Sequence, residues 1–137
     1  MRFKTPKGFI KIFVSGVVIK GKKVLLLHRK KPDVWEFPSG KIEYGEHPSE
    51  TAEREVKEET NLDVKVEKLL GIGSTIRSDK EHELVLSFLC RPKTLKVKLG
   101  ERDHIEYRWF GLNEIKRIKN LATSVQSVLK ELSTLLA

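Results

Sequence analysis

Residues 48–61 constrain the fold most strongly, because they predict a single helix with two chemically different faces. Pro48 suits the first turn of a helix, where its missing N–H leaves no hydrogen bond unmade, and Asn61 suits the left-handed residue that ends one. Ala52 and Val56 lie four residues apart and form a narrow apolar stripe. Such a stripe has to be buried, so the helix is expected to pack on a neighbouring layer.

A second face of this predicted helix carries three carboxylates at positions i, i+3 and i+4, those of Glu55, Glu58 and Glu59. Like charges at this spacing repel, so the face is unfavourable unless a cation neutralises it. Hard carboxylate oxygens suit Mg²⁺ or Mn²⁺. A solvated acidic face is the alternative interpretation of the spacing taken alone.

Apolar runs on both sides of the helix predict a sheet. Strands are expected over residues 9–19, 24–27, 62–66, 83–90 and 107–110. The first two are joined through the turn at residues 20–23 and are expected to form a hairpin. Prolines and glycines punctuate residues 30–46, which are therefore expected to be mostly loop with short extended pieces. Residues 91–102 are expected to form a basic loop or hairpin edge.

The C-terminal segment predicts one amphipathic helix that covers the sheet. Its apolar residues recur on one stripe at helical spacing, namely Leu121, Val125, Val128, Leu129, Leu132, Leu135 and Leu136. Strands and helices interleave along the 137 residues, a length that suits one domain with one core. The expected fold class is therefore α/β or α+β with a mixed sheet.

The charge is distributed unevenly along the chain. There are 27 Lys and Arg against 19 Asp and Glu, a formal net charge of +8. Residues 1–32 hold ten of the basic residues and no acid, whereas residues 40–62 hold seven of the acids. A uniformly basic surface would favour a nucleic-acid partner. A basic first part followed by an acid-dense centre favours instead a small polyphosphate held through metal ions.

The chain contains no apolar stretch near the roughly 18–20 residues that cross a bilayer. Its first residues contain no apolar core of a signal peptide. The single cysteine, Cys90, cannot form an internal disulfide and is expected to be a small apolar residue in a buried strand. We therefore expect a soluble cytoplasmic protein with no membrane partner.

The segment from Gly40 to Leu62 resembles the Nudix box, whose pattern is GX5EX7REUXEEXGU with U a bulky aliphatic residue. The matching residues are Gly40, Glu46, Arg54, Glu55, Val56, Glu58, Glu59 and Leu62. Asn61 replaces the last glycine of the pattern, and Asn is the next best residue for a left-handed helix end. Ser39 stands where many members have glycine. The resemblance to MutT-like Nudix hydrolases implies a single domain over residues 1–137, an α/β/α sandwich with a mixed central sheet flanked by helices.

The resemblance also implies an activity, the hydrolysis of a nucleoside diphosphate linked to another group. Water attacks one phosphorus of the diphosphate, assisted by bound Mg²⁺ or Mn²⁺. By match to the box, Glu55, Glu58 and Glu59 are the metal ligands. The backbone carbonyls of Ser39 and Gly40 are candidate supplementary ligands.

Two further box residues, Arg54 and Glu46, are predicted to pair and to fix the loop against the helix, with Arg54 pointing off the metal face. A direct catalytic role for Arg54 is the alternative. Glu58 is the first choice for the general base. Its rival is an acid from the segment before the last strand, either Glu101, Asp103 or Glu106. His104 lies near that segment and is expected to be a surface residue.

Candidate substrate contacts lie outside the acidic face. Arg29, at the end of the second predicted strand, and Lys41, inside the box, are placed to reach substrate phosphates. Trp35 and Phe37 are candidates for stacking on a base. Packing of this loop on the core is the stronger expectation for both aromatic residues.

By elimination the chain resembles a MutT-type nucleoside triphosphate pyrophosphohydrolase. ADP-ribose hydrolases often have a proline at the position of residues 76–78, and this chain has none there. It also lacks the tyrosine that often marks diadenosine polyphosphate hydrolases. The alternatives are hydrolysis of an RNA 5′ end, of a dinucleoside polyphosphate or of a nucleotide sugar, and a non-catalytic nucleotide-binding domain. A basic surface that follows an RNA backbone would support the first of these. A monomer or homodimer acting on a small nucleotide is expected.

Overall fold

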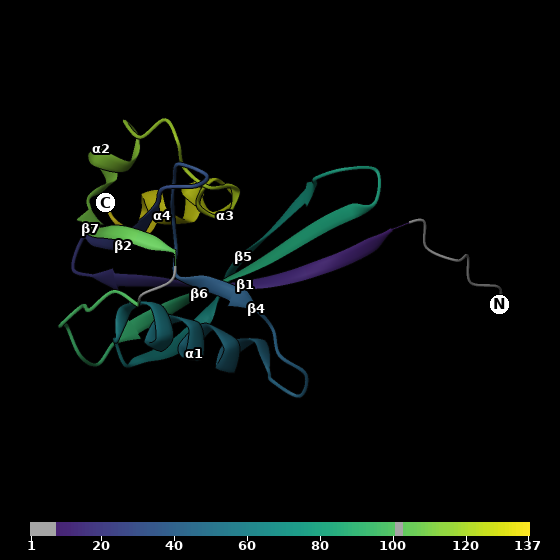
Figure 1. The fold of residues 1–137 in the computed structure, drawn as a ribbon. Helices are drawn as coiled ribbons and strands as arrows, with labels where there is room; N and C mark the ends of the chain where they lie inside the picture. The colour runs from purple at the N-terminus through teal and green to yellow at the C-terminus, as the bar shows by residue number, and fades with distance from the viewer. Residues whose placement is uncertain (1–7, 101–102) are drawn as a thin grey trace.

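The computed structural model describes residues 8–100 and 103–137 and has helices on both faces of a mixed sheet (Figure 1). The strands are β1 Phe9–Lys20, β2 Lys23–Arg29, β3 Val34–Glu36, β4 Ser39–Lys41, β5 Val64–Ile76, β6 Glu81–Pro92 and β7 His104–Phe110. The helices are α1 Pro48–Thr60, α2 Leu112–Ile115, α3 Thr123–Gln126 and α4 Leu129–Leu135. The predicted α/β class with a mixed sheet is confirmed.

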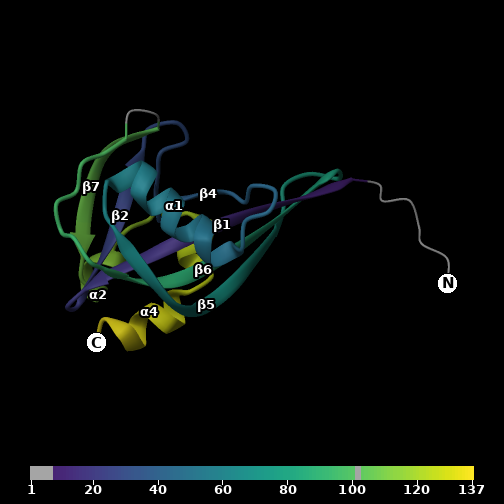
Figure 2. The same cartoon turned by 90° about the horizontal axis from the view of Figure 1, so that it is seen from below.

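The sheet has the strand order β3-β2-β1-β6-β5, with β4 paired to β1 and β7 paired to β2. β1 and β6 run parallel, and the other pairs are antiparallel. Figure 1 shows α1 on one face of the sheet and α3 and α4 on the other, and Figure 2 views the same sheet from the side of α1. This is the α/β/α sandwich that the resemblance implies.

Helix α1 begins and ends where the sequence predicts, because both ends are specified locally. At its start the side chain of His47 accepts a hydrogen bond from the Ser49 N–H, and Glu50 accepts one from the His47 N–H. At its end Asn61 has a φ of 68°, the left-handed conformation that the sequence assigns to it. These caps fix the register of the helix and therefore the direction of its carboxylates.

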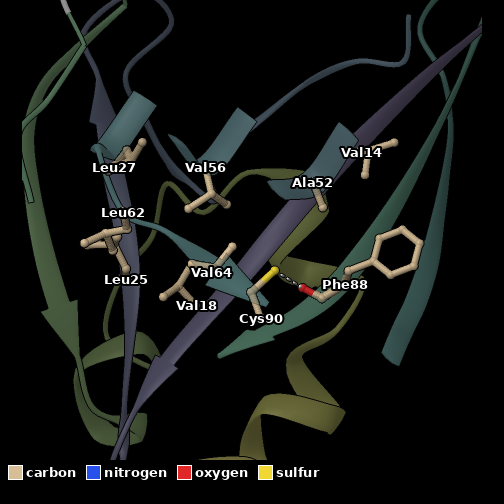
Figure 3. Close-up of a cluster of buried hydrophobic side chains, with 10 residues drawn as sticks. All are labelled: Val14, Val18, Leu25, Leu27, Ala52, Val56, Leu62, Val64, Phe88 and Cys90. Carbon is tan, nitrogen blue, oxygen red and sulfur yellow. Dashed lines mark hydrogen bonds between the residues drawn. The ribbon is translucent and has the colours of Figure 1, made fainter. Parts of the chain in front are cut away.

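Two hydrophobic clusters hold the layers together, one on each face of the sheet. The first lies beneath α1 and includes Ala52, Val56 and Cys90 (Figure 3). The second lies beneath α3 and α4 and includes Val125, Val128 and Leu132. The apolar stripe of α1 is therefore buried as predicted, and so is Cys90, whose S–H donates to the carbonyl of Phe88.

Cys90 is expected to resist alkylation in the folded protein. Burial raises the pKa of its thiol to about 12, and the nearby charge of Glu53 acts in the same direction. The native thiol therefore stays protonated at pH 8, where an unfolded cysteine with an ordinary pKa of about 8.5 is partly ionised. Because unfolded chains lose this proton first, stability should fall as the pH rises from about 8.5 towards the folded value.

Mass spectrometry after treatment with iodoacetamide at pH 8 measures this protection. Labelling should be slow in buffer and rapid in denaturant, with a rate in buffer set by unfolding. Rapid labelling of the native protein would show that Cys90 is accessible and that the first cluster is looser than described.

The prediction of one continuous C-terminal helix is wrong. Val125, Val128, Leu132 and Leu136 of the apolar stripe are buried and its other three residues are half-buried. The segment forms two short helices, because the backbone of Val128 (φ −122°, ψ 18°) leaves the helical region. The break lies against β5, where a Cβ on Gly73 would come within 3.1 Å of Ser127. The glycines of β5 thus let this turn approach the sheet closely.

Several strands are also longer than predicted, among them β2, β5, β6 and β7. β5 continues to Ile76, well past residue 66, and β7 begins at His104 rather than at residue 107. Register shifts near Val66 and Leu69 interrupt the period of two along β5, so its alternation is not visible in the sequence. None of the helices in the described residues is long and apolar enough to cross a membrane.

Two buried hydroxyls, those of Ser15 and Ser87, have no hydrogen-bond partner among the described residues. The two residues lie opposite each other on the parallel strands β1 and β6. A buried polar group left unpaired costs about 1–3 kcal/mol. Replacing Ser87 by alanine is therefore expected to raise the free energy of unfolding by roughly 1 kcal/mol, measured by urea denaturation.

A matched control is Ser133→Ala, because the Ser133 hydroxyl donates to the carbonyl of Leu129 and its loss removes a made bond. This variant should be unchanged or slightly less stable than the parent. A clear loss of stability in Ser87→Ala would mean instead that its hydroxyl is satisfied by an internal water molecule.

Candidate active site

A polar cleft of 690 Å³ lies where α1, β1, β4 and the ends of β2, β3 and β7 meet. The antiparallel pairing of β4 with β1 places Gly40 opposite Val14 and brings the start of the box against the sheet. The predicted site residues that line the cleft are Arg29, Ser39, Gly40, Lys41, Arg54, Glu55, Glu58, Glu59 and Asp103. One cleft therefore contains the box carboxylates and the two basic residues predicted to reach phosphates.

The three carboxylates on α1 differ in exposure. The side chains of Glu55 and Glu59 are 13% and 17% exposed, whereas that of Glu58 is 43% exposed. Glu59 Oε1 accepts the Ser39 N–H at 2.7 Å. Burial raises the pKa of Glu59 to about 8, against the opposing effect of that hydrogen bond, and the charges of Glu55 and Glu36 raise it further. The surroundings of Glu59 thus disfavour its charged form unless a cation lies nearby.

Arg54 pairs with Glu46, as predicted. Its Nε and Nη2 donate to the two oxygens of Glu46 at 2.6 and 3.0 Å, and this pairing lowers the pKa of Glu46 to about 2. A backbone N–H from Glu43 has the same effect. The loop that carries Glu46 is therefore fixed to α1 through a bidentate ion pair.

The expectation that Arg54 points off the carboxylate face is wrong. Its Nη1 donates to Glu55 at 2.8 Å and lies 3.3 Å from both oxygens of Glu58. The arginine side chain is long enough to reach along the helix by one turn while its other nitrogens hold Glu46. Arg54 therefore supplies part of the positive charge that the acidic face requires.

The donor set fits a hard divalent cation. Within residues 8–100 and 103–137, no three acidic, histidine or cysteine side chains are already arranged as a coordination shell. Arg54 donates hydrogen bonds to two of the three carboxylates, those of Glu55 and Glu58. Gly40 approaches Glu55 so closely that a Cβ there would overlap its carboxylate. The Gly40 backbone thus lies directly against the Glu55 carboxylate, and carboxylate oxygens are the hard donors that suit Mg²⁺.

A second cluster at the cleft joins three strands and includes two residues whose role the sequence did not suggest. Glu36 Oε2 accepts from Arg29 Nε and Nη2 at 3.2 and 3.0 Å and lies 2.7 Å from His104 Nε2. The His104 side chain is only 4% exposed, so the expectation of a surface residue is wrong. It is buried because the pairing of β2 with β7 places His104 opposite Arg29, a register that periodicity alone does not reveal.

Glu36 was absent from the predicted site. Burial alone would raise the pKa of Glu36, but the hydrogen bonds from His104 and Arg29 outweigh it and lower that pKa. A single acid between Trp35 and Phe37, in an otherwise apolar stretch, is the sequence feature that indicates a paired buried charge.

The aromatic candidates pack on the core instead of facing the cleft. Trp35 stacks on His28 with ring centroids 4.6 Å apart and meets Phe110 edge to face, and Phe37 is fully buried. Trp35 is therefore corrected from a substrate contact to a packing residue. Among the Phe, Trp and Tyr residues that the structure describes, Phe13 lines the cleft.

The rival candidates for the general base are separated by the structure. Asp103 lines the cleft and lies 3.7 Å from Arg29 Nη1. Glu106 instead pairs with His28 at 3.1 Å, outside the residues that line the cleft, so it is removed as a candidate. Glu101 lies outside the described residues.

Fold and site together define the class: a mixed sheet between helices, with a box helix whose carboxylates line a polar cleft. Residues 11–132 match the family model described as NUDIX domain. The chain therefore belongs to the Nudix family.

Two curated relatives illustrate the range of names within this family. The chain is 40% identical over 123 residues to the dihydroneopterin triphosphate diphosphatase of Escherichia coli K12, covering 80% of this chain and 82% of that protein. It is 33% identical over 111 residues to the ADP-ribose pyrophosphatase of Methanocaldococcus jannaschii, covering 78% of this chain. The chain spans 65% of the length of the latter protein and 36% of two eukaryotic members.

A solved structure supports the fold independently. The MutT protein of Methanosarcina mazei Go1 superposes with a TM-score of 0.81 at 23% sequence identity, covering 95% of this chain and 97% of that one. The sandwich architecture is therefore the one that Nudix proteins adopt.

Proposed function

We propose that this chain is a single-domain Nudix pyrophosphohydrolase that cleaves a diphosphate bond of a nucleoside triphosphate with Mg²⁺ or Mn²⁺. The observation that carries the proposal is the shared cleft, where the carboxylates of α1 lie with Arg29 and Lys41. A polyphosphate needs both kinds of group, because cations must offset its charge beside carboxylates.

The proposal assigns the cation to the carboxylates of α1, and Glu58 has a second task as the general base. Glu55, Glu58 and Glu59 would hold the cation, together with the backbone carbonyls of Ser39 and Gly40. Nudix hydrolases generally use divalent metal ions, and a bound ion of this kind supplies acidification of the attacking water and charge stabilisation at the phosphate oxygens.

The remaining steps belong to side chains. Glu58 is the most exposed of the three box carboxylates and is assigned as the general base that accepts a proton from the attacking water. Arg29 and Lys41 donate hydrogen bonds to the phosphate chain. Arg54 holds Glu46 and so keeps the loop before α1 in place, which makes it a positioning residue.

Two observations favour a nucleoside triphosphate over other substrates that contain a diphosphate bond. The Escherichia coli relative, matched over most of its length, is named for a triphosphate substrate. No proline occurs at residues 76–78, where ADP-ribose hydrolases often have one. The name of the archaeal relative makes ADP-ribose the second candidate.

The test is a panel of substrates assayed with Mg²⁺ and with Mn²⁺. It contains nucleoside triphosphates, dihydroneopterin triphosphate, ADP-ribose, a dinucleoside polyphosphate, a nucleotide sugar and 5′-triphosphate RNA. We expect pyrophosphate release from one or more triphosphates. Exclusive cleavage of ADP-ribose or RNA would replace the proposed substrate class, and inactivity on the whole panel would favour a domain that only binds nucleotides.

A further inference from the structure

Arg29, Glu36 and His104 form a cluster that lines the cleft, and each comes from a different strand. One oxygen of Glu36, Oε2, is the common acceptor: Arg29 donates to it through Nε and Nη2, and His104 Nε2 lies 2.7 Å away. Three donors on one oxygen leave little freedom to any of them. The cluster therefore fixes the orientation of the Arg29 guanidinium.

The burial of the cluster decreases towards the cleft. The side chains of His104 and Glu36 are 4% and 14% exposed, whereas that of Arg29 is 27% exposed. With Nε and Nη2 on Glu36, the remaining nitrogen of Arg29, Nη1, lies 3.7 Å from the more exposed Asp103. The nitrogen of Arg29 that Glu36 does not hold thus faces Asp103, the most exposed acid beside it in the cleft.

The same cluster adjoins the carboxylates of α1. His104 Nδ1 lies 3.9 Å from Glu59 Oε2, so His104 lies between Glu36 and the acidic face. A phosphate chain held at the acidic face would therefore extend towards Arg29. Glu36 and His104 therefore set the distance between the Arg29 guanidinium and the carboxylates of α1.

We propose that Glu36 and His104 are positioning residues that hold Arg29 in the orientation in which its guanidinium contacts the phosphate chain of the substrate. This inference rests on the proposed function, because it names how one cation of that site is kept in place. Neither residue belongs to the box, and neither touches the substrate in this proposal.

A neighbouring histidine provides a matched control. His28 precedes Arg29 on β2, and like His104 it links β2 to β7 through a carboxylate, since its Nδ1 lies 3.1 Å from Glu106. It also contacts Asp33 at 2.6 Å, but it does not line the cleft. A purely structural role for the Glu36 cluster predicts that His28 variants behave like Glu36 variants.

The experiment compares the variants Arg29→Ala, Glu36→Gln, His104→Ala, His104→Gln and His28→Gln. Steady-state kinetics use ATP or GTP with Mg²⁺, whichever the wild-type protein hydrolyses, and calorimetry measures binding of inorganic tripolyphosphate. Loss of a charge-assisted contact should raise KM and the tripolyphosphate Kd about tenfold in Glu36→Gln and His104→Ala, with a smaller change in kcat. His104→Gln should restore most of the loss, because its amide nitrogen can still donate to Glu36.

A double variant tests whether Glu36 acts through Arg29. In the Arg29→Ala background, Glu36→Gln should cause no further increase in KM or Kd, because residues that act as a unit are not additive. His28→Gln should leave both constants at the wild-type value even if its thermal midpoint falls.

Three results would overturn the inference. They are unchanged constants in Glu36→Gln and His104→Ala, effects that add to those of Arg29→Ala, and effects shared with His28→Gln. Calorimetry separates the failure of this inference from the failure of the proposed function. A chain that hydrolyses no substrate of the panel contradicts the proposed function, but the tripolyphosphate Kd values of the variants still decide the role of Glu36 and His104. If the wild-type protein hydrolyses a triphosphate but binds no tripolyphosphate, the proposed function stands and the KM values of the variants decide the role of Glu36 and His104.

Discussion

Glu59→Gln is expected to lower kcat by two to three orders of magnitude, because charge stabilisation by a bound cation is worth several kcal/mol and each 1.36 kcal/mol is a tenfold change in rate. The amide oxygen of glutamine can still accept the Ser39 N–H that Glu59 Oε1 accepts at 2.7 Å. Stability should therefore stay within about 1 kcal/mol of the parent. The change removes one charged oxygen ligand and little else.

Cation binding gives a readout that does not depend on turnover. An ion that binds only the folded state stabilises it by about 2.7 kcal/mol at one hundred times its Kd. The thermal midpoint of the wild-type protein should rise as Mg²⁺ is added, and Glu59→Gln should reduce or abolish that rise. Glu58→Gln is expected to lose activity as well, through the proposed base.

The matched control is Glu53→Gln on the same helix. Glu53 accepts the backbone N–H of Val66 and does not line the cleft, and glutamine keeps the acceptor. Its activity and Mg²⁺ response should equal those of the wild type. Turnover that survives in both Glu58→Gln and Glu59→Gln would contradict the assignment of the acidic face as the cation site.

Gly40→Ala is expected to lower activity about a hundredfold while the protein remains folded, since a displacement of about 1 Å in a catalytic site can cost that much. A Cβ on Gly40 would overlap the carboxylate of Glu55, which has to move away. That carboxylate is the end of a flexible side chain, so the fold can absorb the change without moving its backbone. The thermal midpoint and kcat are measured on the same preparation.

Gly111→Ala provides the comparison for this substitution. An added Cβ there would meet its neighbours at ordinary contact distances, the nearest being Glu114 Oε1 at 3.5 Å, and Gly111 does not line the cleft. Wild-type activity in Gly40→Ala would show that the position of Glu55 is not critical. Unfolding of Gly40→Ala would show that its absence of a side chain serves stability instead.

The parts of the site predicted from sequence are those that local interactions determine. The caps of α1 are encoded within a few residues of each other, so its limits and its carboxylate face follow from the spacing. The pairing of Arg54 with Glu46 follows from the box resemblance and from the geometry of arginine. The inward direction of Ala52 and Val56 needs only the helical period.

The parts that could not be predicted depend on contacts between distant segments. His104 is buried because β7 pairs with β2, which places His104 opposite Arg29, a residue 75 positions earlier in the chain. The break at Val128 lies where the C-terminal segment approaches the glycines of β5, which a helical stripe does not encode. In both cases the sequence pattern is locally consistent with more than one outcome, and tertiary packing selects between them.

Arg54 reaches Glu55 and Glu58 from the helix that carries them, so the acidic face already has a counter-ion of its own. A cation arriving from solvent must displace a positive group that is tethered to the protein and cannot diffuse away. This exchange reduces the free energy gained when the ion binds. The tethered arginine also allows the chain to fold without the ion. We therefore expect Mg²⁺ alone to bind weakly and to raise the thermal midpoint only at high concentration, and to bind more tightly together with the nucleotide, whose phosphates complete the ion's oxygen shell.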